Sequence, residues 1–178
     1  FEKYTEKSQK IVDAAQKLAL RENHQQFKPE HLLAAMMEDR ERIAEKLIRA
    51  AGGNADQVID NAEAALAAIP KVQGGSGQLY ADPELARAFD MAEQLANKAK
   101  DEYVTVERLL QALAMGNSKP AKILAEAGAA AQKLNAAIND MRKGRAATSP
   151  NAEDQFESLK KYTKDFTALA EEGKLDPV

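Results

Sequence analysis

The feature that most constrains the fold of this chain is an internal duplication at a spacing of 77 residues. Seven residues within the window 14–35 recur without a gap 77 positions later: Ala15, Leu18, Ala19, Glu30, Leu32, Leu33 and Ala35 return as Ala92, Leu95, Ala96, Glu107, Leu109, Leu110 and Ala112. With one residue dropped, the match continues from Leu47-Ile48 to Ile123-Leu124 and from Ala51-Gly52 to Ala127-Gly128. The matches fall on apolar positions and stop signals, as a duplicated folding unit requires.

Composition decides which kind of unit is repeated. The chain has 178 residues, with 35 Ala and 17 Leu against 13 Ile plus Val. Alanine is the best helix former and β-branched residues favour strands, so the unit is expected to be helical. The sequence predicts an all-α fold of two pseudo-twofold repeats of four helices, over residues 1–70 and 80–143. A helical solenoid is the alternative, but it needs three or more repeats and only two are visible.

Capping residues, prolines and glycines along the chain indicate where the helices begin and end. Thr5 is a good N-cap, and Pro29 suits the first position of a second helix. A third helix is expected from about Arg40 to Ala51, ended by Gly52-Gly53, and a fourth begins behind Asn54. Residues 70–81 are expected to form a flexible connection, after which Asp82-Pro83 opens the second repeat.

The character of the sequence changes after Met141. Residues 144–153 lack an apolar period and predict a flexible linker between a domain at 1–143 and a further amphipathic helix within 154–178. That helix carries Phe156, Leu159, Phe166 and Leu169, but only a few residues follow it. We expect its packing partner to be missing, so the chain is interpreted as a fragment whose segment 154–178 is poorly anchored.

Charge and residue content exclude several classes of function. The 25 basic and 28 acidic residues give a net charge of −3, which argues against a nucleic-acid partner. No apolar run is long enough to span a membrane, and the start is no signal peptide, so a cytoplasmic location is expected. Cysteine is absent, and His24 and His31 lack a third ligand at a defined spacing, so no metal site is predicted. Gly74–Gly77 is interpreted as plain linker, because no Lys-Ser/Thr follows it.

No catalytic signature stands out, and carboxylate pairs cannot be told from solvated charge. A helical duplication joined by a linker to a further helix is most economically a recognition module. The methionines, such as Met36 and Met37, could line an adaptable groove, although core packing is the more economical role at helical spacing.

Two segments carry a resemblance to a known family. The segment from Asn23 to Leu33 (Asn-His-Gln-Gln-Phe-Lys-Pro-Glu-His-Leu-Leu) resembles the N-terminal domain of the Clp unfoldases. The segment 152–178 is similar to the entry into the first AAA+ module of the disaggregase branch of that family. The resemblance implies the substrate-recognition domain of an ATP-driven homohexamer that threads unfolded or aggregated proteins through its pore with the DnaK chaperone system. The chain itself is then a monomer and no enzyme, without a cofactor; ATP and Mg²⁺ belong to the parent protein.

The resemblance also implies a set of substrate-binding residues. Thr5, Asp101 and Glu107 match family positions associated with substrate handling, and Phe89 and Leu95 are apolar neighbours expected to join them. Each has a structural alternative: Thr5 caps a helix, Glu107 complements a helix dipole, and Phe89 and Leu95 belong to the core.

Two other functions stay open. One is an adaptor-binding domain of a protease-partnered Clp unfoldase; the other is an unrelated scaffold or a small enzyme acting through surface carboxylates. The sequence does not tell which substrates are chosen, whether the connection at 70–81 gates a groove, or how the domain sits on a hexamer.

Overall fold

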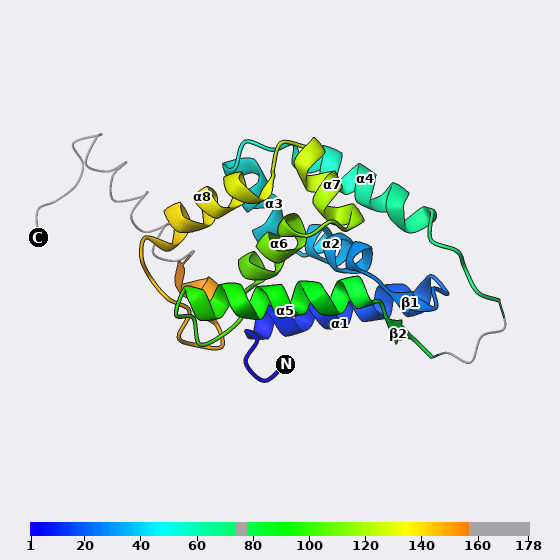
Figure 1. Cartoon of the computed structure of the whole chain (residues 1–178), viewed down its shortest axis with the longest axis horizontal. Coiled ribbons are helices and arrows are strands. Elements are labelled where there is room, and N and C mark those ends of the chain that lie inside the picture. Colours follow the sequence, from blue (N-terminus) through cyan, green and yellow to red (C-terminus); the bar gives the residue numbers. More distant parts are fainter. Residues whose placement is uncertain (74–77, 157–178) are drawn as a thin grey trace, which may run out of the picture.

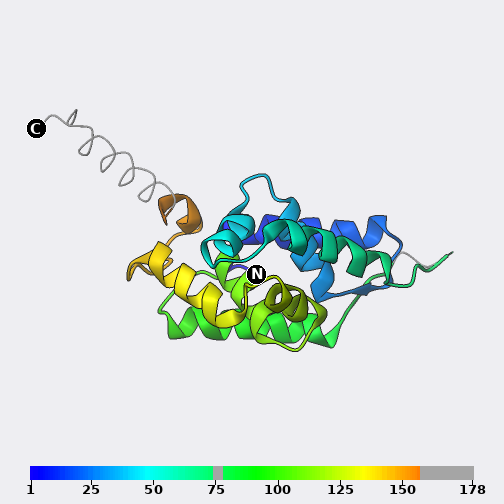
Figure 2. The ribbon, with the colours of Figure 1, turned by 90° about the horizontal axis from the view of Figure 1, so that it is seen from above.

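The computed structural model describes residues 1–73 and 78–156. The long first helices of the two halves run along the same side of the molecule in Figure 1, and Figure 2 shows them apart from each other, with other helices between them. The first half contains α1 (Glu6–Arg21), β1 (Gln26–Phe27), α2 (Pro29–Glu38), α3 (Ile43–Ala50) and α4 (Ala55–Ala67). The second half contains β2 (Tyr80–Ala81), α5 (Pro83–Lys98), α6 (Val106–Met115), α7 (Lys119–Glu126) and α8 (Ala131–Arg142).

The helices confirm the duplication. Helices α5 and α6 begin 77 residues after α1 and α2, and α7 and α8 begin 76 residues after α3 and α4. The first helices have 16 residues each, the second 10 each and the third 8 each. The all-α class with two four-helix repeats is therefore confirmed, including the dropped residue before the third helix.

Most of the expected helix starts are also confirmed. The side chains of Thr5, Asn54 and Asp82 each accept a hydrogen bond from a backbone N–H in the first turn of α1, α4 and α5, as N-caps do. The expected start of the third helix at Arg40 is wrong: α3 begins at Ile43. The chain first makes a turn, in which Arg42 adopts a left-handed conformation with φ 58°.

A backbone pairing joins the two repeats and departs from the expected flexible connection at 70–81. Strands β1 and β2 pair in parallel, with Phe27 opposite Ala81. An isolated parallel bridge joins Tyr4 to Val104. The two pairings are related by the 77-residue shift: in each, the segment before a repeat's first helix contacts the segment before the second helix of the other repeat. Residues 74–77 of the connection lie outside the described part of the chain.

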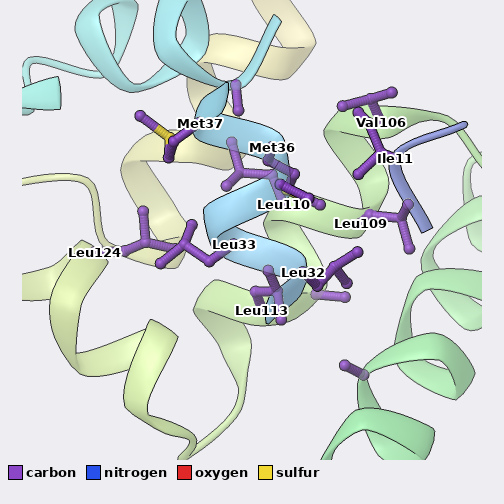
Figure 3. Close-up of a cluster of buried hydrophobic side chains, with 14 of the residues drawn as sticks. Ile11, Leu32, Leu33, Met36, Met37, Val106, Leu109, Leu110, Leu113 and Leu124 are labelled. Carbon is purple, nitrogen blue, oxygen red and sulfur yellow. The ribbon is translucent and has the colours of Figure 1, made fainter. Parts of the chain in front are cut away.

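The core lies between α2 and α6, whose side chains face one another in Figure 3. All residues from Pro29 to Met37 and from Val106 to Leu113 are buried. These two helices are therefore enclosed by the other helices rather than lying on the surface. The ends of α3 and α7 also meet, and a Cβ added to Gly53 would lie 2.9 Å from the Ala129 Cβ.

The chain turns back after α8 and packs against the globule. We call residues 145–156 the strap; it lies beside the end of α8 in Figures 1 and 2. Ala147, Ala152, Glu153 and Phe156 are buried, and residues 152–156 are helical. The flexible linker expected at 144–153 is therefore not observed. The sequence did not indicate this packing, because the few buried residues of the strap follow no helical period. The rest of the segment 154–178 lies outside the described residues.

Within the described residues, no helix is both long and apolar enough to cross a membrane.

Candidate functional site

Three of the predicted site residues come together where α1 and α6 begin. Thr5 is the N-cap of α1, Glu107 lies in the first turn of α6, and Asp101 follows α5. All three are buried, Thr5 and Glu107 completely. They belong to one polar cluster that the strap covers.

Arg142, at the end of α8, holds the two acidic residues together. Its Nη1 and Nη2 donate to the two carboxylate oxygens of Asp101 at 2.9 and 3.0 Å, and its Nε donates to Glu107 Oε1 at 2.9 Å. Arg108 Nε donates to Asp101 Oδ2 at 3.2 Å. Burial by itself would raise the pKa of Asp101, but the hydrogen bonds from Arg142 and from a backbone amide outweigh burial and hold that pKa below its ordinary value.

The strap is bound through its main chain. The amide of Ala147 donates to Asp101 Oδ1 at 2.9 Å, and its carbonyl accepts from the amides of Glu102 at 2.8 Å and Tyr103 at 3.3 Å. Further along, the carbonyl of Pro150 accepts from the amide of Glu6 at 2.8 Å. The globule therefore offers one acceptor and three amide donors to a passing polypeptide chain.

Two buried side chains of the strap add to its attachment, beside the ion pair of Asp154 with Lys7. Glu153 Oε2 accepts from the Thr5 hydroxyl at 2.6 Å and from the Val106 amide at 3.1 Å. Burial, and next the charge of Glu107, raise the pKa of Glu153 to about 7. The Phe156 ring is 2% exposed and lies under the guanidinium groups of Arg142 and Arg145, at 4.5 and 5.1 Å from the ring centre.

The two predicted apolar residues lie outside this cluster, and both are half-buried against the core. Leu95 lines a cleft of about 410 Å³ between α5, α6 and α8, together with Arg108, so the cleft borders the polar cluster. Phe89 instead packs edge-on against the rings of Phe1 and Tyr4, with ring centres 5.3 and 6.2 Å apart.

The sequence pattern did not predict Arg108, Arg142, Glu153 or Phe156 as parts of the site. One signal for Arg108 was present: the 77-residue shift superimposes Asp101 and Arg108 on His24 and His31. The two histidines form a buried hydrogen bond of 2.7 Å between His24 Nδ1 and His31 Nε2. Nothing local marked Arg142, Glu153 or Phe156, because each acts on residues that are distant in the sequence.

The arrangement suits binding rather than holding a metal. Within 1–73 and 78–156, no group of three or more His, Cys, Asp or Glu side chains could hold a metal ion. The acidic groups of the cluster already contact arginines, a hydroxyl or backbone amides, so their chemistry is that of hydrogen-bond acceptors for a chain segment.

This chain belongs to the Clp repeat (R) N-terminal domain family, whose model matches residues 3–127. Over its whole length it is similar to two proteins named chaperone protein ClpB: it is 55% identical to the one of Mesorhizobium japonicum and 52% identical to the one of Rhizobium meliloti. It spans about a fifth of the length of these relatives (21% of each).

Solved structures agree on the fold. The Hsp104 N-terminal domain from Candida albicans matches with a TM-score of 0.76 at 21% identity, covering 84% of this chain and 97% of that one. The N-terminal domain of the ClpV1 ATPase from E. coli matches with a TM-score of 0.62 at 17% identity, covering 78% of this chain and 87% of that one.

Proposed function

We propose that this chain is the substrate-recognition N-terminal domain of a disaggregase chaperone and binds unfolded or aggregated polypeptides. Its relatives named ClpB are about five times longer, which leaves room for the ATP- and Mg²⁺-dependent modules that the resemblance implies. In this proposal, ATP hydrolysis, the hexamer and cooperation with the DnaK system belong to that longer protein, in the cytoplasm. Residues 1–143 are proposed as the recognition domain.

The observation that carries the proposal is that the polar cluster already holds a piece of polypeptide by its main chain. Asp101 and the amides of Glu102 and Tyr103 hold both the N–H and the C=O of Ala147. Every non-proline residue of an unfolded protein offers the same two groups, so such contacts do not depend on sequence. A few main-chain contacts beside a partly apolar cleft suit weak binding of many different chains.

The proposal is tested by isosteric changes in the whole chain. Asp101→Asn removes the charge that orients Arg142 and accepts the bound amide, while Asp140→Asn makes the same change at an exposed position of α8. We expect Asp101→Asn to lower the affinity for fluorescein-labelled casein at least fivefold and Asp140→Asn to leave it unchanged, measured by anisotropy. Leu95→Gln is expected to weaken binding as well, because it makes the cleft floor polar.

Stability has to be measured alongside binding, because Asp101 is buried in an ion pair. Binding is compared at a temperature where circular dichroism shows every variant folded. If the folded Asp101→Asn variant binds casein as tightly as the wild-type chain does, the role of Asp101 in the site is disproved. We also expect the affinity for casein to be micromolar or weaker and insensitive to ATP–Mg²⁺; nanomolar binding of one folded partner instead would favour the adaptor-binding alternative.

A further inference from the structure

Besides its main-chain contacts, the strap places two side chains in the polar cluster. Glu153 and Phe156 are three residues apart in a helical turn, so they project from the same face. Each enters a site of its own: Glu153 lies at the start of α6, and Phe156 lies under two guanidinium groups. Both are nearly fully buried, at 4% and 2% exposure.

The site for the carboxyl group exists at the start of α6 but not at the start of α2. Helix α6 begins with Val106, whose amide is free to donate to Glu153, whereas α2 begins with Pro29, which has no amide hydrogen. Thr105, the N-cap of α6, makes no capping bond of its own. In the first repeat the corresponding N-cap residue is Lys28, and it pairs with Asp82, the counterpart of Thr5, at 3.2 Å. The start of α2 is therefore closed by an ion pair between the two repeats, while the start of α6 leaves the Val106 amide and the nearby Thr5 hydroxyl for an acceptor from another segment.

The site for the aromatic ring has a matching chemistry. Arg142 is fixed by Asp101 and Glu107, so its guanidinium presents a flat face to the Phe156 ring. Cation–π contacts of this kind are strongest when they are desolvated, as this buried pair is. An aliphatic side chain would fill the space without that attraction.

We propose that the site beneath the strap receives, from unfolded polypeptides, segments that carry an acidic residue, whose carboxyl group accepts the hydrogen bonds, and an aromatic residue about one helical turn later, and that the strap is its intramolecular competitor. This inference rests on the proposed function and names the substrate class of the same site. A tethered segment has an effective concentration that reaches the millimolar range for short linkers, so it excludes weak ligands until it is displaced. When substrate displaces the strap, residues 145–156 are released from the domain, so substrate binding loosens the connection to the chain that follows.

The experiment uses the whole chain in three forms. The loosened form carries Glu153→Ala and Phe156→Ala, which remove the acceptor and the aromatic ring. The control form carries Glu63→Ala and Gln155→Ala, changes of the same kind at exposed positions of α4 and of the strap. The probes are a fluorescein-labelled peptide with the sequence of residues 145–156 and the same peptide with Ala in place of Glu153 and of Phe156.

We expect the loosened form to bind the native peptide at least tenfold more tightly than the wild-type and control forms do, and to bind the altered peptide at least tenfold more weakly than the native one. Equal affinity of all three forms, or equal affinity for the two peptides, would overturn the inference. Should the loosened form unfold, the wild-type chain still tests the inference: excess native peptide should displace the strap and shift the amide resonances of its residues Ala147 and Glu153, and unchanged resonances would overturn the inference.

Labelled casein separates this inference from the proposed function. If casein binds the loosened form more tightly than the other two, both stand. If casein binds all three forms equally, the proposed function stands and the competition is overturned. If casein binds none of them while the native peptide binds the loosened form, the proposed function fails and the pocket's preference for this chemistry stands.

Discussion

Arg142 is the residue on which the polar cluster depends. It is 3% exposed and makes hydrogen bonds to Asp101, Glu107 and Thr105, while its guanidinium also covers Phe156. A buried ion pair adds little over an apolar pair of the same shape, but removing one partner leaves an uncompensated charge. Without Arg142, the carboxylates of Asp101 and Glu107 would both lose their principal partner.

Arg142→Ala is therefore expected to lower the free energy of unfolding by about 3–5 kcal/mol. Arg49→Ala serves as the matched control, because Arg49 forms surface ion pairs with Glu45 and Asp56, so its removal should cost no more than about 1 kcal/mol. Urea unfolding followed by circular dichroism measures both. Similar values for the two variants would show that the cluster contributes no more than a surface pair.

Glu153 gives the strap a dependence on pH. Its pKa is raised to about 7 when the strap is docked, against an ordinary value of 4.5 when it is free. The docked strap therefore binds the proton more tightly than the free strap, so docking is strongest below about pH 4.5 and weakens as the pH rises through about 7. Asp101 does not reverse this trend above about pH 5, because its lowered pKa keeps it ionised there.

We expect the Ala147 amide to be better protected from hydrogen exchange at about pH 6 than at about pH 8, once the rates are corrected for intrinsic exchange. In Glu153→Gln, whose side chain does not titrate, the protection should be the same at both values. A carboxyl-carbon NMR titration of Glu153 gives the midpoint directly. A midpoint near 4.5 in the wild-type chain would contradict the buried position of this side chain.

At the scale of elements, the ends of the third helices set how closely the two repeats approach. Gly52 and Gly128 end α3 and α7 with φ of 89° and 88°, a conformation that glycine adopts without strain. The amide of Asn54 then donates to the carbonyl of Ala127 at 2.8 Å, so the two helix ends are joined by their main chains. Gly53 lies in this contact and has no room for a side chain.

Gly53→Ala is expected to destabilise the protein by about 1–3 kcal/mol, as overpacking of a close contact does. The added Cβ would meet Ala129 at 2.9 Å and the Ile48 side chain at 3.0 Å. Gly116→Ala is the control, because Gly116 has an extended backbone and its nearest neighbour atom is 3.9 Å from the added Cβ. Equal melting temperatures for the two variants would show that α3 and α7 can separate without cost.

At the scale of the whole molecule, neither repeat is complete alone. The two most buried helices, α2 and α6, belong to different repeats and share one core, and each repeat supplies a backbone partner to the other. A substitution that destabilises one repeat should therefore destabilise both.

Leu110→Ala tests this cooperativity. Leu110 is fully buried in α6, so the change should cost about 2–5 kcal/mol and raise hydrogen exchange in α2 and α4 as much as in α5 and α6. Leu20→Ala is the control, because Leu20 is 43% exposed in α1 and should have little effect. Faster exchange confined to the second repeat would mean that the repeats unfold separately.

The sequence by itself determined the eight helices of the two repeats and their duplication, because the signals that carry them are local. An N-cap such as Asn54, a proline such as Pro29 or a glycine such as Gly52 acts within one helical turn, and apolar spacing fixes which face is buried. The family resemblance added Thr5, Asp101 and Glu107 as members of one proposed site, although Thr5 lies in the other repeat from the two acidic residues.

Only the tertiary structure decided what surrounds those residues. The pairing of β1 with β2 and the docking of Ala147 are made by main-chain atoms, which leave no mark in the side-chain pattern. The burial of Asp101 depends on Arg142, 41 residues away, and the contact of Thr5 with Glu153 spans 148 residues. Interactions over such separations form only once the core between α2 and α6 has brought distant segments together, so a local sequence pattern cannot predict them.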